Sequence, residues 1–340
     1  VFPHKRKRFT REKALEEYLP KGDLIYPLRQ HIGGTAEPVV AVGDRVLEGQ
    51  LLAKASGDIS APVHASVSGT VKAIEPRKTV SGKEILSVVV ENDGLYEKMP
   101  VPEIKPWQEL EVGERLRRIQ EAGVVGMGGA GFPTHIKLAV RNPKRIRYVL
   151  INGTECEPYM TSDYRRMLES PECLVEGLRI VLSLFERATG IFAVEDNKRD
   201  AITAMQLASG SEPRMEVRVL ETKYPLGAER MLIYACTGAE INASQLPADA
   251  GCIVLNVETL HAIYEALVLG LPVTKRAVTV TGKALKDPKN ILVRIGTSFS
   301  ELPEAAGGYA KKAEKYVCGG PMRGVEMKSL EVPVTKTVTG

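Results

Sequence analysis

Strand-like and helix-like patterns alternate through residues 109–270, and this alternation constrains the fold more than any other feature of the sequence. Four short apolar runs have the length of strands, and segments with helical periodicity lie between them. Such alternation predicts an α/β sheet that is covered by helices on both faces, with ligands bound at the carboxyl ends of its strands. The expected strands are residues 148–151, 190–194, 215–220 and 251–255, and the expected helices are 110–122, 173–185, 200–208, 229–236 and 259–269.

A glycine-rich segment lies between the first of these helices and another expected near Lys137. Gly126, Gly128, Gly129 and Gly131 fall within six consecutive positions. Glycine lets the backbone approach a ligand closely, and free N–H groups at the start of a helix bind anions such as phosphate. The segment lacks the Gly-Lys-Ser/Thr of a Walker loop, and its match to G-x-G-x-x-G is weak evidence alone. It predicts either a phosphate-binding loop or a tight turn between two helices.

Three further polar clusters lie where expected strands end. Each has a simple structural explanation, because a glutamate suits the first turn of a helix and an asparagine suits an N-cap. Together with the glycine-rich segment, however, they all lie at strand-to-helix turns and are expected to meet in one crevice. The residues concerned are Asn152, Glu155 and Glu157 in the first cluster, Gly227 and Glu229 in the second, and Asn256 in the third.

Residues 25–98 have the pattern of a β domain, with short apolar runs separated by glycine and proline. Several segments resemble the barrel-sandwich fold of biotinyl and lipoyl carrier domains. Those carriers hold their cofactor on a lysine, and no lysine lies between Ala55 and Val71. We therefore expect a docking module in which His64 is a packed or exposed strand residue rather than a ligand. The segments that carry the resemblance are 42–50, 61–64 and 68–71, and the expected strands are 39–42, 46–53, 67–74 and 85–90.

The remaining parts of the chain are shorter. Residues 1–24 form an N-terminal extension with a helix-like piece at 11–18, and its basic cluster at 4–8 is expected to be a solvated terminus. The prolines of residues 99–108 indicate a linker. Residues 271–340 predict a small α+β unit. Its expected elements are strands at 277–281 and 290–295, a helix at 300–306 and a turn at 318–322.

Composition narrows the classes of function. The net charge of the 340-residue chain is only +4, and no stripe of lysine and arginine is interleaved with aromatic residues, so nucleic acid is not an expected partner. No apolar run reaches the roughly eighteen residues of a membrane span, and the N-terminus lacks a signal-peptide pattern. The five cysteines contain no C-x-x-C. They predict free thiols in a reducing compartment and argue against a zinc or iron–sulfur site formed by this chain alone.

Four motifs cover the glycine-rich segment and the three polar clusters, and they are Gly126-Met-Gly-Gly-Ala-Gly-Phe-Pro-Thr, Asn152-Gly-Thr-Glu-Cys-Glu-Pro, Gly227-Ala-Glu and Asn256-Val-Glu-Thr-Leu. Two C-terminal sequences accompany them, Cys318-Gly-Gly-Pro-Met and Val332-Pro-Val-Thr-Lys. The four motifs resemble, in order and spacing, those of the flavoprotein subunit of respiratory complex I, which binds FMN and oxidises NADH. The barrel-sandwich segment and the C-terminal sequences resemble more closely the C subunits of Rnf complexes, which are membrane-bound ferredoxin:NAD oxidoreductases.

This resemblance covers essentially the whole chain and implies its fold. It implies a central Rossmann-like FMN/NADH-binding α/β domain, an N-terminal β barrel-sandwich hybrid domain and a C-terminal SLBB-like, ubiquitin-like α+β domain. The implied site includes no catalytic side chain and no metal. Its residues are Gly126, Gly128, Gly129, Ala130 and Gly131 for close backbone approach; Phe132 for stacking on a nucleotide ring; Lys137 for the flavin phosphate; Asn152 and Asn256 for the flavin ring or ribityl chain; Glu157 and Glu229 for the nicotinamide nucleotide; and the neighbouring Glu155 and Gly227.

Two departures from complex I bear on nucleotide affinity. The loop that begins at Asn152 lacks one of the carboxylates of complex I, and Val140 stands where the complex I protein has an aromatic residue. Related Rnf proteins continue into a ferredoxin-like region with two [4Fe–4S] clusters. We therefore expect the sequence, which ends at Gly340, to stop just before that region.

The resemblance implies a peripheral subunit on the cytoplasmic side of a membrane complex. It would transfer electrons between NAD(H) and iron–sulfur clusters, coupled in the complex to ion translocation. Two alternatives stay open at this stage. One is a cobalamin reductase of a diol-utilisation microcompartment, and the other is a non-catalytic docking scaffold.

Overall fold

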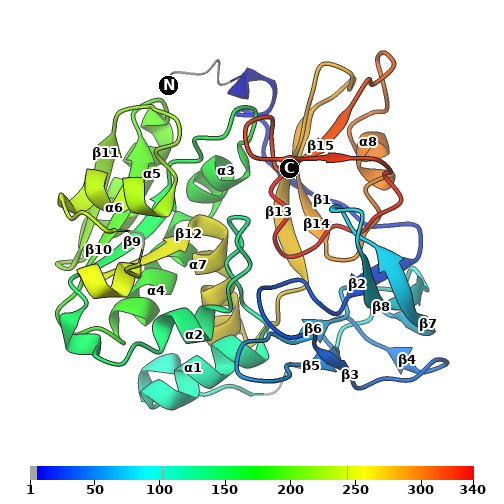
Figure 1. The fold of residues 1–340 in the computed structure, drawn as a ribbon, viewed down its shortest axis with the longest axis horizontal. Coiled ribbons are helices and arrows are strands. Elements are labelled where there is room, and N and C mark those ends of the chain that lie inside the picture. Colours follow the sequence, from blue (N-terminus) through cyan, green and yellow to red (C-terminus); the bar gives the residue numbers. More distant parts are fainter. Residues whose placement is uncertain (1–5, 102, 243) are drawn as a thin grey trace.

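The computed structural model describes residues 6–101, 103–242 and 244–340. Figure 1 shows three adjoining regions, with the α/β region on the left, the N-terminal β region at the lower right and the C-terminal region above it.

A parallel sheet of four strands forms the centre of the α/β region. The strands are β9 (Tyr148–Gly153), β10 (Thr189–Glu195), β11 (Met215–Leu220) and β12 (Cys252–Asn256), and their order in the sheet is β11-β10-β9-β12. The chain therefore runs outward from β9 through β10 to β11 and returns to the other side of β9. The strand order reverses between β9 and β12, which is the position where open α/β sheets bind ligands.

Helices cover both faces of this sheet, as the alternation predicted. Alternate side chains of β9 show the division, because Val149 and Ile151 pack with α4, α5 and α7 whereas Leu150 packs with α6. The expected helix after the glycine-rich segment is short, and α3 was not expected. The helices are α1 (Val112–Glu121), α2 (Thr134–Leu138), α3 (Ser162–Glu169), α4 (Pro171–Leu182), α5 (Arg199–Ser209), α6 (Glu229–Thr237) and α7 (Val257–Tyr264), which continues as a π-helical turn at Glu265–Leu269.

The N-terminal β region consists of two small antiparallel sheets. The expected strand at 39–42 is wrong: β3 comprises only Glu37–Pro38, and Val39 and Val42 are exposed. His64 is buried in its strand, as expected for a packed residue. One sheet has the order β2 (Leu24–Pro27), β8 (Glu84–Asn92), β7 (Gly69–Lys78) and β4 (Arg45–Val46), and the other has β3, β5 (Leu51–Lys54) and β6 (Val63–His64).

The C-terminal region confirms the expected strands and helix and adds a strand from the N-terminal extension. The helix-like piece expected at 11–18 is wrong, because Leu15–Glu17 forms β1 and pairs in parallel with β14. Ion pairs from Lys289 to Glu16 and from Lys275 to Glu17 favour this pairing, which residue periodicity alone could not reveal. The elements are β13 (Lys275–Val280), β14 (Lys289–Arg294), α8 (Glu301–Ala305), β15 (Tyr316–Cys318) and β16 (Val325–Met327), with the expected turn at 318–322 joining the last two strands.

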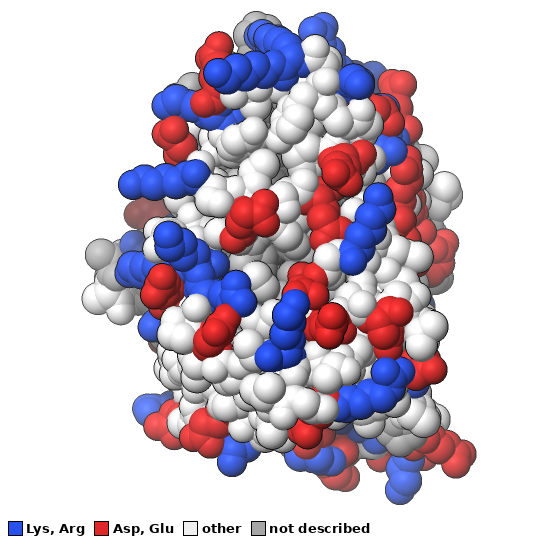
Figure 2. Space-filling view, turned by 90° about the vertical axis from the view of Figure 1, so that its right-hand side faces the viewer, with Lys and Arg blue, Asp and Glu red and all other residues white. Residues whose placement is uncertain are grey.

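The surface carries charges of both signs. Figure 2 shows the face on the right of Figure 1, where lysine and arginine side chains are interspersed with aspartate and glutamate over most of the area. Within the described ranges, no helix has both the length and the apolar character needed to traverse a bilayer.

Candidate functional site

The strand ends at the reversal point bring two predicted residues side by side. Asn152 on β9 and Asn256 on β12 are direct partners in the parallel register. The Asn152 amide donates to the carbonyl oxygen of Gly227 at 2.9 Å, which brings the loop before α6 to the same place. Three of the predicted polar loops therefore meet beyond the carboxyl ends of β9 and β12.

Asn256 also caps the helix that follows it. Its Oδ1 accepts the backbone N–H of Glu258 at 2.9 Å, so the helix-cap explanation is confirmed. Its Nδ2 donates to Oδ2 of Asp163 at 2.6 Å. A side-chain amide has two N–H donors, and this bond uses one of them. The side chain is thus held at both ends and retains a donor for a ligand.

The glycine-rich loop reaches the same strand ends. A Cβ atom on Gly128 would lie 3.1 Å from Cβ and 3.3 Å from Nδ2 of Asn256, so a side chain here would press on Asn256. Gly128, Gly129 and Ala130 are exposed, and we find no hydrogen bond from their amides to any described part of the chain. Gly129 has φ +111°, which L side chains rarely adopt. The loop presents free backbone donors to solvent.

The ends of this loop are fixed by backbone hydrogen bonds. The amide of Gly126 donates to the Phe132 carbonyl at 2.8 Å, and the amide of Gly131 donates to the Gly126 carbonyl at 2.9 Å. The Ile32 amide, from the N-terminal β region, donates to the Gly131 carbonyl at 2.9 Å. Phe132 is half-buried beside the loop. The loop is thus a closed turn, and the following α2, with five residues, is too short to supply a helix dipole of its own.

A lysine and a glutamate from different elements form an ion pair next to β12. Nζ of Lys137 on α2 is 2.9 Å from Oε1 of Glu229 at the start of α6, and it also donates to the Val254 carbonyl of β12 at 3.0 Å. Both side chains of the ion pair are partly exposed. Lys137 is therefore held against β12, two residues before Asn256.

Glu155 and Glu157 have protein partners instead of facing this crevice together. The Glu155 carboxylate accepts the backbone N–H of Asp163 at 2.9 Å, and its side chain is only 5% exposed. The Glu157 carboxylate accepts the N–H of Met322 at 2.5 Å, in the turn between β15 and β16. We expected one of the two carboxylates to face a ligand and the other to be solvated. The structure shows that Glu155 is buried and that Glu157 binds the C-terminal region.

Two lysines that the sequence did not single out hold the loop after β9. Lys7 donates to the carbonyls of Glu155 and Glu157 at 2.8 and 3.1 Å, and its side chain is 10% exposed. The expectation of a solvated basic terminus is therefore wrong for Lys7, while residues 4 and 5 of that cluster lie outside the described residues. Lys198 donates to the Thr154 carbonyl at 2.6 Å, and burial lowers its pKa to about 8.

Asp163 was also missed, because α3 was not predicted. Burial, followed by the nearby charges of Glu155 and Glu258, raises the pKa of Asp163 to about 7. A carboxyl group with a pKa near neutrality at the edge of a crevice is a common feature of functional sites. No spacing in the sequence indicated that this aspartate would contact Asn256.

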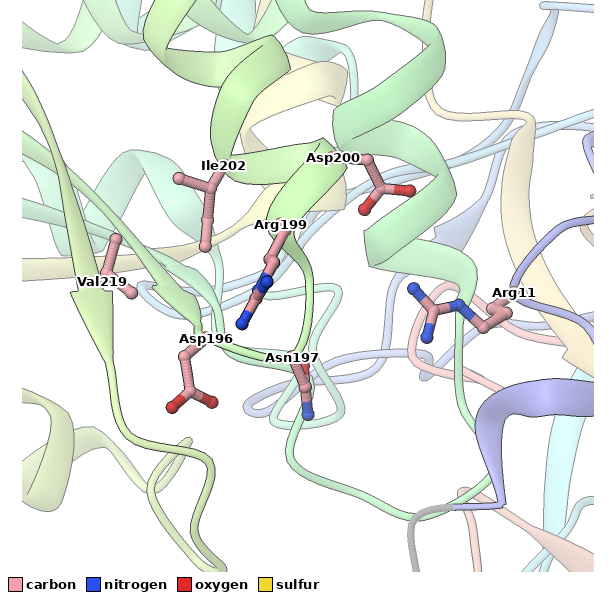
Figure 3. Close-up of a pocket in the computed structure, with 7 residues that line it drawn as sticks. All are labelled: Arg11, Asp196, Asn197, Arg199, Asp200, Ile202 and Val219. Carbon is pink, nitrogen blue, oxygen red and sulfur yellow. The ribbon is translucent and has the colours of Figure 1, made fainter.

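A separate cavity of about 700 Å³ lies at the carboxyl ends of β10 and β11. Figure 3 shows Arg11 and Asp200 on one side of it and Asp196 on the other. None of the predicted site residues lines this cavity, which lies away from the reversal point between β9 and β12. Its lining residues are Arg11, Asp196, Asn197, Arg199, Asp200, Ile202 and Val219.

Comparison with family models supports the division seen in the fold. A model described as the Nuo51 FMN-binding domain matches residues 119–265, the RnfC barrel sandwich hybrid domain matches residues 1–95, and the SLBB domain matches residues 277–326. These matches confirm the expected fold classes.

Curated proteins give longer matches. The chain is 42% identical to the C subunit of the Na⁺-translocating ferredoxin:NAD⁺ oxidoreductase complex of Acetobacterium woodii, over the whole chain and 77% of that protein. It is also 42% identical to the C subunit of the proton-translocating complex of Clostridium ljungdahlii, over 74% of that protein. The C subunit of an ion-translocating oxidoreductase complex from Pseudomonas aeruginosa is 41% identical, with 92% of this chain and 41% of that protein aligned.

Among solved structures, an NAD⁺-reducing [NiFe]-hydrogenase in the H₂-reduced state has a similar fold. The TM-score is 0.56 at 21% identity, and the match covers 69% of this chain and 46% of that chain.

Proposed function

Because the chain belongs to the family of Rnf complex C subunits, we propose that it binds FMN and NAD(H) at the crevice between β9 and β12. The observation that carries the proposal is the convergence of four loops at the point where the strand order reverses. They are the loops of Gly128, Asn152, Gly227 and Asn256, with Lys137 bound to Glu229 beside them.

The donors of this crevice suit a phosphorylated ring ligand. The exposed amides of the glycine-rich loop and the ammonium group of Lys137 match a phosphate. Asn152 and Asn256 each use one N–H of the side-chain amide within the protein and keep the other. A flavin ring carries carbonyl and nitrogen acceptors, which such amides can bind. The residues present therefore fit FMN.

In this proposal the chain orients its ligands rather than attacking them. Lys137 neutralises the phosphate, Asn152 and Asn256 hold the ring, and Glu229 binds hydroxyl groups of the dinucleotide. When bound, FMN would accept a hydride from the nicotinamide and release electrons singly. The loop after β9, fixed by Lys7 and Lys198, keeps Asn152 in place.

The electrons would pass to iron–sulfur clusters of the complex. The relatives described above are ferredoxin:NAD⁺ oxidoreductase subunits, and for this reason we propose ferredoxin rather than a corrinoid as the second substrate of the complex. We also propose a peripheral position on the cytoplasmic side of the membrane, with the N- and C-terminal regions binding other subunits.

Replacing Lys137 by methionine tests the assignment of the phosphate site. A hydrogen bond to a charged group contributes about 1.5–3 kcal/mol, or about 10- to 100-fold in affinity. We expect Lys137→Met to weaken FMN binding by about this factor and riboflavin binding less than about threefold, because riboflavin lacks the phosphate. Quenching of flavin fluorescence during titration gives both dissociation constants.

Lys144→Met is the matched control, because Lys144 is exposed and lies seven positions later in the same region. Equal losses for FMN and riboflavin would contradict the phosphate assignment. If the unmodified chain binds neither flavin, or if NADH fails to bleach bound FMN without oxygen, the scaffold alternative is favoured instead.

A further inference from the structure

Asp163 lies directly behind the proposed flavin site. Its Oδ2 accepts the Asn256 side-chain N–H at 2.6 Å, and Asn256 in turn packs against Gly128 of the glycine-rich loop. One residue, Asn256, therefore lies between Asp163 and the proposed flavin site. Its hydrogen bond sets the orientation of an amide that the proposed function assigns to the flavin.

Two other carboxylates surround Asp163. Its backbone N–H donates to Oε1 of Glu155, in the loop after β9, at 2.9 Å. Glu258 is in the first turn of α7, and its N–H donates to the same Asn256 that Asp163 binds. Like charges at such positions disfavour ionisation of the central carboxyl group, and burial disfavours it further.

Two arginines near this cluster are bound to groups other than the Asp163 carboxylate. Arg276 on β13 donates to the carbonyls of Met127 and Lys336. Arg166 on α3 forms an ion pair with Glu258 at 2.9 Å.

Lys7 lies 3.6 Å from Glu155 and donates to backbone carbonyls. Among the described residues, no lysine or arginine forms an ion pair with Asp163. Burial, with Glu155 and Glu258, raises the pKa of Asp163 to about 7, so its charge is not fixed at neutral pH.

We propose that Asp163 takes up a proton when the bound flavin is reduced, and so acts as a proton-binding positioning residue behind Asn256. Two electrons and one proton convert FMN to its anionic hydroquinone. The new negative charge favours a second proton from solvent on the Asp163 carboxylate, which becomes neutral. No bond to the flavin is formed or broken by Asp163, and Asn256 keeps its hydrogen bond.

This proposal rests on the proposed function and makes a separate prediction about the reduction potential. Above pH about 7, Asp163 is ionised before reduction and protonated after it. The reduction equilibrium should then change by up to an extra tenfold per pH unit, which is about 30 mV for a two-electron couple. Asp163→Asn has no titrating group at this position. Its flavin reduction potential should lack this extra dependence on pH, and at high pH it should be higher than the potential of the unmodified chain.

The experiment is a spectroscopic redox titration of the FMN-loaded chain between pH about 6 and 9. The unmodified chain should show the extra slope above pH about 7, and Asp163→Asn should not. Asp58→Asn, an exposed carboxylate in the N-terminal β region, is the control and should keep the slope. A purely structural role for Asp163 would alter flavin affinity and leave the slope unchanged.

A second variant keeps the test informative if Asp163→Asn folds poorly. Glu155→Gln retains the acceptor for the Asp163 N–H but removes a neighbouring charge, so the extra slope should begin at lower pH. If the unmodified chain binds FMN and its slope equals that of Asp163→Asn, or if Glu155→Gln leaves the onset unchanged, this inference is wrong while the proposed function stands. If the chain binds no FMN, the proposed function fails first.

Discussion

Arg166→Met is expected to destabilise the protein by about 3–5 kcal/mol, because it leaves a buried carboxylate without its cation. Nε of Arg166 is 2.9 Å from Oε2 of Glu258, and Nη2 is 3.1 Å from Oε1. The two side chains are 8% and 4% exposed. Burial alone would raise the pKa of Glu258, but Arg166, with His261 and Arg276, holds it at about 2. Urea unfolding monitored by circular dichroism measures the loss.

The double variant Arg166→Met/Glu258→Gln separates the charge from the packing. Glutamine keeps an acceptor for the Ala277 N–H, which the Glu258 carboxylate accepts at 2.8 Å, and it removes the unpaired charge. Much of the lost stability should therefore return. Arg117→Met, at an exposed ion pair with Glu114, is the control and should cost no more than about 1 kcal/mol. Equal losses in the single and double variants would show that the charge pair is not the cause.

The ion pair of Arg166 and Glu258 also predicts how the stability of the protein depends on pH. The pKa of Glu258 is about 2 in the folded protein, below its ordinary value of 4.5. A lowered carboxyl pKa contributes stability that is present above pH 4.5 and is lost as the pH falls toward 2. Glu258 also donates its N–H to Asn256, so loss of the pair would loosen the proposed flavin site as well.

Local sequence patterns were sufficient to predict an element where that segment buries its own apolar face. Strands β9, β10 and β12 lie within one or two residues of their expected bounds, because parallel strands that are buried on both faces form continuous apolar runs. The pairing of Asn152 and Asn256 also followed from topology, since both occupy strand ends of one sheet, and the loop of Gly227 reaches them through the hydrogen bond from Asn152.

Local sequence patterns were insufficient where contacts with a distant segment determine the local structure. Residues 11–18 have a helix-like pattern in isolation, but Leu15–Glu17 within them pairs with β14 more than 270 residues later, where basic side chains meet its glutamates. Lys7 resembles a solvated terminus, yet it binds carbonyls of the loop after β9. Asp163 is one of several charged residues of α3, and only the folded chain shows that it contacts Asn256.

Lys336→Met is expected to remove a pH dependence of stability that the unmodified chain has between about 7 and 10. Nζ of Lys336 donates to the carbonyls of Pro62 and Gly123, each at 2.7 Å, and the residue is 1% exposed. These contacts join the C-terminal segment to the N-terminal β region and to the residue before the glycine-rich loop. Burial lowers the pKa of Lys336 from 10.5 to about 7.

The direction of this pH dependence follows from the number of protons that the folded and unfolded states bind. Between pH about 7 and 10.5, the amine is protonated in the unfolded chain and neutral in the folded one. The unfolded state therefore binds more protons, and stability rises by about 1.4 kcal/mol per pH unit across this window. Methionine has no titrating group. The stability of the unmodified chain minus that of Lys336→Met should thus increase with pH by this slope, whatever the constant cost of the two lost hydrogen bonds.

Urea unfolding at a series of pH values from about 6 to 10 measures this difference, and Lys78→Met, at an exposed position, should show none. A difference that does not vary with pH would mean that Lys336 stays charged in the folded protein, despite burial and the absence of a carboxylate partner among the described residues. If the slope is found, the same neutral amine holds the Gly123 carbonyl just before the glycine-rich loop. The stability that this junction contributes would then fall as the pH drops from about 10.5 to about 7, and would change little below that, where the amine is protonated in both states.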